Sequence, residues 1–251
     1  MQLAKNLYQL SGPFYSNSSS VYGITGEHNL VLIDAGYDAP QLDVIEDNIR
    51  YWGLDRYELS HVLITHCHFD HCGNAAALRE RGAKLVASRI DAEAIESGDD
   101  RTIGFAFMGR KFPATPVDVK LDGDCTIEID GMHFDFIATP GHTAGGVCIR
   151  TTLADGKIAL FSGDTIHVGL NCGYARLGWN GSVDFNAKDY FDSIVKLKDL
   201  QVDYVLAGHE YNCLKDGSKL LQDAYKQALL SLRDLPYNYV STAMRNGIPI
   251  F

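Results

Sequence analysis

Apolar residues follow two patterns along the chain. One is the short apolar run bounded by turn residues, which is typical of β-strands. Such runs occur at 29–33, 61–65, 84–87, 126–129, 133–138, 147–151, 158–162 and 204–207. The other is a helical spacing of three or four residues, which predicts helices within 42–52, 187–200 and 221–232. Because strands and helices mix without a Pro/Ser-rich linker, we expect one layered α/β domain spanning 1–251, with helices covering the sheet faces.

Two long stretches, 97–116 and 167–186, fit neither pattern. Connections of this length are uncommon inside a compact domain and often form lids or binding loops. We therefore expect both stretches to lie near a functional site, with room for a short helix at 105–108 in the first.

The composition is that of a globular protein with an acidic balance. The 251 residues include 22 Lys and Arg against 32 Asp and Glu, a formal net charge of −10, and 46% are hydrophobic. This balance disfavours nucleic acid as a partner, because affinity for the phosphate backbone requires many basic contacts. No apolar run approaches the roughly 20 residues that span a bilayer, and the N-terminus shows no export signal. We expect a cytoplasmic protein that binds no membrane and whose six cysteines are thiols rather than a disulfide framework.

Three histidines and an aspartate follow the expected strand at 61–65. They are His66, His68, Asp70 and His71. Alternation at the strand end places the first two side chains on one side, and a tight turn into a helix can bring the other two beside them. Neutral imidazole and carboxylate are ligands for Zn, Fe, Mn or Co. The cluster therefore predicts a metal site, from which alternation points the intervening Cys67 away.

Three further residues of ligand type stand after apolar strands, each preceded by a glycine. They are His142, Asp164 and His209. A strand end is a rigid support for such a residue, and glycine permits close backbone approach around it. The repetition of this arrangement predicts that all three converge on the histidine cluster. His167, three residues after Asp164, is a further candidate that could face a substrate.

The ordered set of seven residues is similar to that of the metallo-β-lactamase-fold superfamily, and the similarity covers most of the chain. Asp34, in the segment Ile33-Asp34-Ala35-Gly36, resembles an early aspartate of the family that supports the ligands. The resemblance implies a four-layer αββα sandwich, in which two mixed β-sheets pack face to face with helices on the outer faces. The residues alone predict only a layered α/β fold.

The resemblance also implies a hydrolase with two divalent metal ions, zinc foremost and iron or manganese as alternatives. It assigns His66, His68 and His142 to one ion, Asp70, His71 and His209 to the other, and Asp164 to a bridging position. In such a dinuclear site a metal-bridging hydroxide attacks the substrate carbonyl. Asp70 is a candidate for passing a proton to the leaving group, and Tyr174 for donating a hydrogen bond to the carbonyl oxygen.

Within the superfamily, the motifs look most like those of the glyoxalase II-like hydrolases, which cleave thioesters and have lactonases and ester hydrolases as relatives. Tyr174 follows Asn171-Cys172-Gly173, where glyoxalase II commonly has a basic residue for the glutathione carboxylate. The segment after His209 is short for the helical substrate domain of that family. We therefore expect a small-molecule substrate that is a thioester, an ester or a lactone.

Other residues of the two irregular stretches are candidates for substrate contacts. A cation that pairs with an anionic substrate group could be Arg110, Lys111 or Arg176. An apolar pocket wall could come from Phe105, Phe107, Met108, Phe112 and Trp179. Both sets are hypotheses about specificity.

Two other functions are compatible with the sequence. A mononuclear iron dioxygenase, similar to the persulfide dioxygenases of the same superfamily, would use the two histidines and one carboxylate of His66, His142 and Asp164. A non-catalytic binding protein is expected to have lost ligands, and all seven are present. The hydrolase is therefore the leading prediction.

Overall fold

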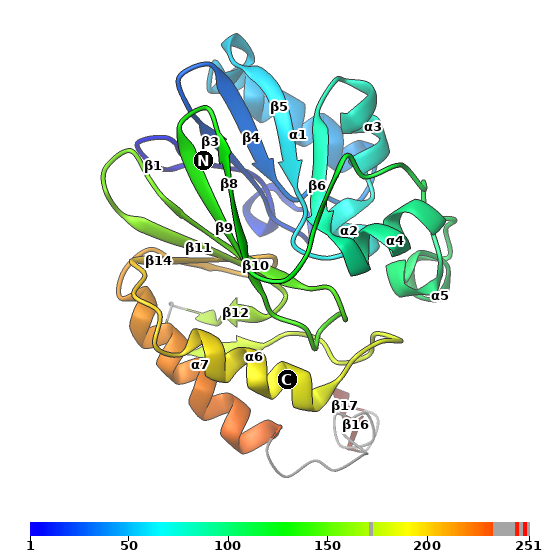
Figure 1. Ribbon diagram of the computed structural model, residues 1–251, viewed down its shortest axis with the longest axis vertical. Helices are drawn as coiled ribbons and strands as arrows, with labels where there is room; N and C mark the ends of the chain where they lie inside the picture. The colour runs from blue at the N-terminus through cyan, green and yellow to red at the C-terminus, as the bar shows by residue number, and fades with distance from the viewer. Residues whose placement is uncertain (171–172, 233–243, 246–247, 250–251) are drawn as a thin grey trace.

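The computed structural model describes residues 1–170, 173–232, 244–245 and 248–249. Two β-sheets lie face to face, with helices on their outer faces (Figure 1). The first sheet follows the sequence order: β1 (Gln2–Ala4), β2 (Leu7–Ser11), β3 (Val21–Thr25), β4 (Asn29–Ile33), β5 (Glu58–Leu63), β6 (Lys84–Ser88) and β7 (Val119–Leu121). The second sheet has the order β15 (Asn212–Cys213), β14 (Tyr204–Ala207), β11 (Ile158–Gly163), β10 (Val147–Thr152), β9 (Met132–Ala138) and β8 (Cys125–Ile129). Two short hairpins pair β12 (Ile166–Val168) with β13 (Ala175–Leu177) and β16 (Met244–Arg245) with β17 (Ile248–Pro249).

Both large sheets are mixed. In the first, β1 to β4 pair in antiparallel fashion and β4 to β7 in parallel fashion. In the second, β11 and β14 are parallel, whereas the other neighbours are antiparallel. Parallel neighbours need a crossover connection, which explains why helices separate these strands in the sequence.

Helices connect the strands and cover the outer faces. The described ones are α1 (Ala39–Tyr51), α2 (Phe69–Cys72), α3 (Ala75–Glu80), α4 (Arg89–Ser97), α5 (Gly104–Met108), α6 (Ala187–Leu197) and α7 (Gly217–Ser231), with 3-10 turns η1 (Pro13–Tyr15), η2 (Leu54–Arg56) and η3 (Asp100–Thr102). The helix α1 begins where Asp38 accepts a hydrogen bond from the Gln41 N–H, and it buries Leu42 and Ile45. The helical spacing predicted for 42–52 therefore describes the buried face of α1.

Three apolar layers join the four structural layers. Along β4, Val31 and Ile33 belong to the core between the two sheets, whereas Leu30 and Leu32 belong to the core beneath α1, as strand alternation requires. A third core lies between the second sheet and the helices α6 and α7. The predicted αββα sandwich of two mixed sheets is confirmed.

Two regions differ from the sequence prediction. The apolar pattern does not predict β1 to β3, because buried polar residues such as Gln9 and Ser11 interrupt the apolar run of β2. The stretch 167–186 is not one continuous loop, because it begins within the hairpin of β12 and β13. In the stretch 97–116, the short helix α5 occupies 104–108, close to the predicted position.

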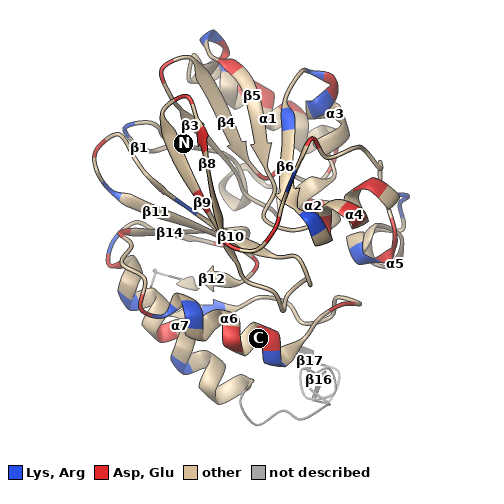
Figure 2. Ribbon diagram, in the orientation of Figure 1, with Lys and Arg blue, Asp and Glu red and all other residues tan. Residues whose placement is uncertain are grey.

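Charged side chains lie mainly on the outer helices and the loops, where acidic and basic segments are interspersed (Figure 2). Several of them pair across elements: Arg79 lies 2.9 Å from Asp118 and Arg89 lies 2.7 Å from Asp122. No described helix is both long enough and apolar enough to cross a bilayer.

Candidate metal centre

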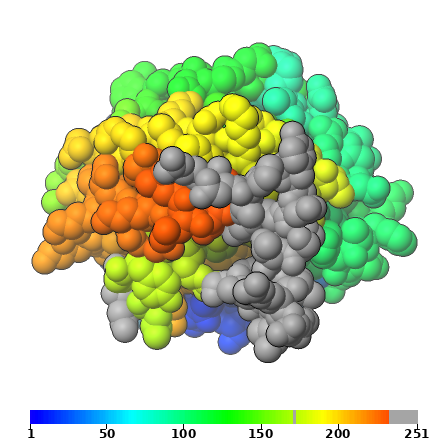
Figure 3. Space-filling model, turned by 90° about the horizontal axis from the view of Figure 1, so that it is seen from below, coloured from blue at the N-terminus to red at the C-terminus, as the bar shows by residue number. Residues whose placement is uncertain are grey.

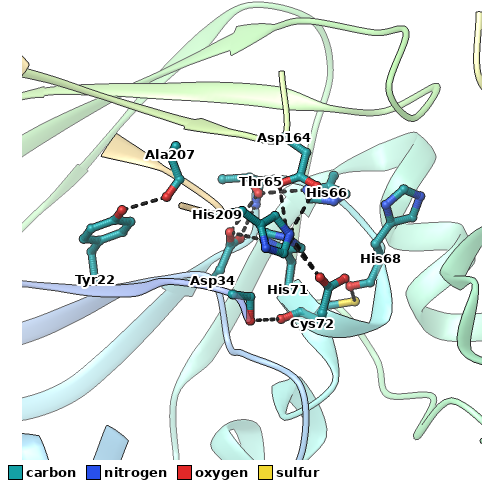
Figure 4. A network of polar contacts seen from close by, with 12 residues as sticks. Tyr22, Asp34, Thr65, His66, His68, His71, Cys72, Asp164, Ala207 and His209 are labelled. Atoms are coloured by element: carbon teal, nitrogen blue, oxygen red, sulfur yellow. Dashed lines mark hydrogen bonds and ion pairs between the residues drawn. The ribbon is translucent and has the colours of Figure 1, made fainter. Parts of the chain in front are cut away.

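The histidine cluster lies in the loop that leaves β5 and in the short helix α2. His66 and His68 are buried in the loop, and His71 is buried in the helix. Asp34 follows β4 in a left-handed backbone conformation, with φ of 62°. Its carboxylate accepts hydrogen bonds from the N–H and the hydroxyl of Thr65 at 2.8 and 2.9 Å, and it contacts Nδ1 of His71 at 2.9 Å (Figure 4). One buried carboxylate thus orients both the end of the strand and a candidate ligand.

The other three candidate ligands follow strands of the second sheet. The strands β9, β11 and β14 run in the same direction, so their carboxyl ends lie at the same edge. His142 lies in the loop after β9, Asp164 directly follows β11, and His209 follows β14 after one glycine. The loop that carries His142 needs Gly141, whose φ is 134° and where a Cβ would lie 2.3 Å from Cα of Tyr190.

All seven predicted residues meet at this edge. They form three overlapping groups whose candidate ligand atoms lie within 4.8 Å of one another: His66, His68 and His142; His66, His71 and Asp164; Asp70, His71 and His209. In the first group, Nε2 of His142 lies 3.0 Å from Nδ1 of His68. In the third group, Nε2 of His209 lies 3.1 Å from Nε2 of His71 and 3.1 Å from Oδ2 of Asp70.

Asp164 lies between the two outer groups. Its Oδ1 is 3.3 Å from Nε2 of His71, and its Oδ2 is 3.4 Å from Nε2 of His209. The same Oδ2 is 3.5 Å from Nε2 of His142, on the other side of the site. One carboxylate therefore contacts residues of both outer groups, the placement that the resemblance implies for it.

The hydrogen bonds of two imidazoles fit metal ligation. His71 directs Nδ1 at the carboxylate of Asp34, and His209 directs Nδ1 at the carbonyl oxygen of Ser18 at 2.8 Å. Oxygen atoms of this kind accept hydrogen bonds, so Nδ1 donates in both residues and each Nε2 is left with a lone pair. The two Nε2 atoms face each other at 3.1 Å, where their lone pairs repel unless a proton or a cation lies between them.

Orphaned polar atoms give a second, independent test of the fit. Among the described residues, Nε2 of His66, Nε2 of His68 and Oδ1 of Asp164 are buried without a hydrogen-bond partner. Such atoms are rare in folded proteins because an unpaired buried polar group costs free energy. Coordination to a metal ion would satisfy all three, and imidazole and carboxylate donors suit zinc and other divalent ions.

The electrostatics of the site favours a cation. Burial lowers the pKa of His66 and of His68 well below the ordinary histidine value, so both are neutral, as metal ligands must be. Burial also acts to lower the pKa of His71, but the carboxylates of Asp164 and Asp70 raise it to about 10. This part of the site therefore attracts positive charge, which a metal ion can supply in place of a proton.

A buried carboxylate outside the seven residues joins the two parts of the site. Asp91, in the first turn of α4, accepts hydrogen bonds from the Cys67 N–H at 2.8 Å, the Thr143 hydroxyl at 2.9 Å and the Gly145 N–H at 2.9 Å. It thereby ties the histidine loop to the loop after β9. Burial raises the pKa of Asp91 to about 6. Sequence reasoning misses this residue, because Ser88 and Asp91 look only like the start of a helix.

The cysteines near the cluster are not among the candidate ligands. Cys67 and Cys72 are buried, and the three ligand groups of the described residues include neither of them. The thiol of Cys72 donates to the carbonyl oxygens of Cys67 and His68 at 3.0 and 3.1 Å. Cys67, Cys72, Cys125 and Cys148 are free thiols, as the sequence predicts, and Cys172 lies outside the described residues.

A cavity of about 750 Å³ opens beside the metal centre. His209 lines it together with His167, whose Nε2 lies 3.3 Å from Oδ1 of Asp164. Tyr174 also lines the cavity and is 45% exposed. His167 and Tyr174 thus lie where they could meet a substrate, and their roles stay predictions.

Two of the three candidate cations are paired with carboxylates, and the third lies away from the cavity. Arg176 lines the cavity, but it forms an ion pair with Glu210. Arg110 lies 3.0 Å from Asp38, at the start of α1. Lys111 is exposed and does not line this cavity.

The five candidate wall residues separate into different environments. Trp179 lines the cavity, and Phe107 packs edge-on against it with ring centroids 4.7 Å apart. Phe112 is buried in the core beneath α1, and Met108 packs against the same core, so these two belong to the fold. Phe105 is 77% exposed. The predicted apolar wall is thus correct for Trp179 and wrong for Phe112, whose spacing does not distinguish wall from core.

Comparison with known proteins agrees with this geometry. The family model of the metallo-beta-lactamase superfamily matches residues 12–209. The chain belongs to this superfamily and is a metal-dependent hydrolase with this fold. A subclass B3 metallo-beta-lactamase of Bradyrhizobium japonicum superposes with a TM-score of 0.73 at 25% identity, over 96% of this chain and 95% of that one.

Curated relatives carry one recurrent name. A hydroxyacylglutathione hydrolase of Rhizobium meliloti is 33% identical over 210 residues, which cover 83% of this chain and 69% of the relative. A protein of the same name from Rhizobium etli is 34% identical over 201 residues, which cover 79% of this chain and 64% of the relative. The chain thus spans about two thirds of the length of these relatives. The predicted resemblance to glyoxalase II-like hydrolases is confirmed.

Proposed function

We propose that this protein hydrolyses small thioesters, esters or lactones with two divalent metal ions, of which zinc is the first candidate. The observation that supports this is the placement of Asp164 between two groups of buried donors. The first ion would be held by His66, His68 and His142, and the second by Asp70, His71 and His209, with Asp164 shared. When bound, such a pair of ions supplies a water of lowered pKa and positive charge for the developing oxyanion.

The protein residues have separate tasks in this proposal. Asp34 and the carbonyl oxygen of Ser18 hold two imidazoles in the tautomer that presents Nε2 to the site. Asp70 would pass to the leaving group the proton that the attacking water releases. Burial acts to raise its pKa, but His71 and His209 lower it well below the ordinary value, so Asp70 is ionised before it takes up that proton.

Tyr174 is assigned to the carbonyl oxygen of the substrate, because its side chain lies on the wall of the adjoining cavity. A phenol there would donate a hydrogen bond that strengthens as negative charge develops on that oxygen. Replacing Tyr174 with Phe should lower kcat by about tenfold with little change in metal content. An unchanged kcat would remove Tyr174 from the mechanism.

The names of the relatives favour a thioester as the first substrate to test, since hydroxyacylglutathione is a thioester. We further propose that residues 1–251 act as one catalytic domain, because both sheets contribute candidate ligands. A cytoplasmic location completes the proposal; it agrees with the absence of a membrane-spanning helix among the described residues.

Turnover after metal loading tests the function. The purified protein should hydrolyse at least one member of a panel of thioesters, esters and lactones, lose this activity to a chelator, and regain it with zinc, iron or manganese. Hydrolysis that persists after the metal has been removed, as checked by elemental analysis, would contradict the proposal.

A further inference from the structure

The cavity beside the metal centre contains a cation that is already neutralised. Arg176 of β13 forms an ion pair with Glu210, the residue after His209. Charge-assisted hydrogen bonds between guanidinium and carboxylate are among the strongest side-chain contacts. The side chains are 31% and 29% exposed, so both are partly shielded from water.

The backbone holds both partners of this pair against the same strand, β12. Arg176 lies opposite His167 in the pairing of β12 with β13. Glu210 forms a bridge to Val168 of β12 and has a φ of 64°, a conformation that few residues other than glycine adopt. The carboxylate is therefore carried by a fixed segment next to the arginine.

The rest of the described wall is uncharged apart from two histidines. It consists of Pro13, Asn17, Ser18, Leu170, Tyr174, Leu177, Trp179 and Tyr211. Arg176 and Glu210 are the only Lys, Arg, Asp or Glu side chains among the described residues that line the cavity, and their formal charges cancel. The wall joins the N-terminal segment to the β12–β13 hairpin, shown in blue and yellow-green in Figure 3.

Two buried polar atoms of the described wall, on Asn17 and on His167, lack a hydrogen-bond partner. The side-chain oxygen of Asn17 is buried and has no hydrogen-bond partner among the described residues. An anionic group beside the pair would have to displace Glu210 from Arg176, or stay next to Glu210 with no other Lys or Arg among the described residues that line the cavity.

We propose that the Arg176–Glu210 pair makes this cavity a site for an uncharged, largely apolar part of the substrate and excludes a carboxylate-bearing part. This inference rests on the proposed hydrolase function in one respect, which is that the occupant of the cavity is a substrate. Hydroxyacylglutathione, named for the curated relatives, carries carboxylates. The expected substrate class therefore differs from theirs: thioesters or esters of uncharged thiols or alcohols.

Calorimetric binding to the metal-loaded protein tests the preference without turnover. The probes are two thioethers with the same alkyl chain, one ending in a carboxylate and the other in the primary amide. The wild-type protein should bind the amide at least tenfold more tightly. In the variant Glu210→Gln, which frees Arg176, the ratio of carboxylate to amide affinity should rise at least tenfold. Direct binding of a carboxylate to the metal ions contributes equally to the ratio in the variant and in the wild type, so it cancels when the two ratios are compared.

Two further variants keep the test decisive. Asp135→Asn removes the acidic partner of Arg150, 2.7 Å away on β9 and β10, and should leave the ratio unchanged. Arg176→Gln leaves Glu210 alone in the wall and should move the ratio in the opposite direction, so the proposal stays testable if Glu210→Gln does not fold. A ratio of carboxylate to amide affinity that neither cavity variant moves would overturn the inference.

Hydrolysis of the matching pair of thioesters separates this inference from the proposed function. Equal turnover of the neutral and carboxylate-bearing thioesters would overturn the preference and leave the hydrolase intact. Absence of any turnover in the metal-loaded protein, with the binding preference present, would overturn the hydrolase and leave the preference intact.

Discussion

The two sheets contribute to the metal centre in different ways. The first sheet supplies four candidate ligands within six residues of one loop and helix, and the buried carboxylate of Asp34 orients that segment. The second sheet supplies His142, Asp164 and His209 one at a time, from the ends of three strands that run in the same direction. The first contribution is local in the sequence, whereas the second exists only once the fold has formed.

The residues that orient the ligands therefore differ from the residues that bring the two groups of ligands together. In the first part, hydrogen bonds to Asp34 orient His71 and the end of the strand, so a change at Asp34 should alter affinity for metal while leaving the fold in place. Between the parts, Asp164 contacts both groups and Asp91 ties the two loops. A change at these two residues should therefore affect the site as a whole.

The largest effect is expected for Asp164→Ala. Without the shared carboxylate, the two groups lose both the negative charge between them and the fixed distance, so turnover should fall by at least about 1,000-fold and metal content below one ion per chain. Elemental analysis and a turnover assay measure both effects. Asp192→Ala, on the exposed surface of α6, is the control and should match the wild type. Full activity of Asp164→Ala would refute the role of the bridge.

Asp91 should make stability depend on pH. Burial raises its pKa from 3.8 to about 6, so its stabilising contribution is complete below about pH 4 and is lost as the pH rises through about 6. The shift corresponds to about 3 kcal/mol. The difference in free energy of unfolding between wild type and Asp91→Asn should therefore change by about this amount between pH 4 and pH 7. The wild type becomes less stable relative to the variant as the pH rises.

Denaturant titration at several pH values, at equal metal loading, measures this difference. Comparing the two proteins cancels the other carboxyl groups, which titrate in both. A difference that is constant across this pH range would show that Asp91 does not titrate there.

Asp34→Asn sharpens the comparison within the first part. An asparagine there can direct its N–H at Nδ1 of His71, which forces the proton of that imidazole onto Nε2, the candidate ligand atom. Affinity for metal should fall by about 10- to 100-fold while the secondary structure is retained. Competition with a chromogenic chelator measures the affinity, and Asp47→Asn, on the exposed side of α1, is the control. Wild-type affinity in Asp34→Asn would contradict the orienting role.

The smallest effect is expected at the cavity wall. Phe107 packs edge-on against Trp179, whose carbonyl oxygen accepts from Nδ1 of His142 at 2.7 Å. An aromatic pair of this kind contributes about 0.5–1.5 kcal/mol, so Phe107→Ala should raise KM by about two- to tenfold. Phe105→Ala, next to it in α5 and 77% exposed, should leave KM unchanged. Equal effects of the two variants would show that the contact with Trp179 is not used.

Much of the fold and of the site could be predicted from the sequence. The helical spacing around Leu42 and Ile45 identifies a buried helix face because periodicity reports directly on burial. The density of His66, His68, Asp70 and His71 indicates a metal site without any knowledge of the fold. His142, Asp164 and His209 each stand alone after a strand. They are predicted as ligands only because this arrangement is repeated and because the full set resembles that of the superfamily.

The remaining features depend on contacts that have no local sequence signal. Asp91 meets Cys67 and Thr143 only after the sheets pack, so nothing in the sequence of α4 marks it. Arg176 looks like a free cation until the fold places Glu210 beside it. The sequence offers Phe112 as a candidate for the cavity wall, but its side chain lies in the core beneath α1.

We propose that the seven residues form two metal sites that share Asp164. The most direct test is the number of divalent ions per chain, measured by elemental analysis after saturation with zinc, iron or manganese and removal of free metal. We expect about two ions per chain in the wild type. One iron per chain that no supplementation raises, or no metal under any of these conditions, would contradict it.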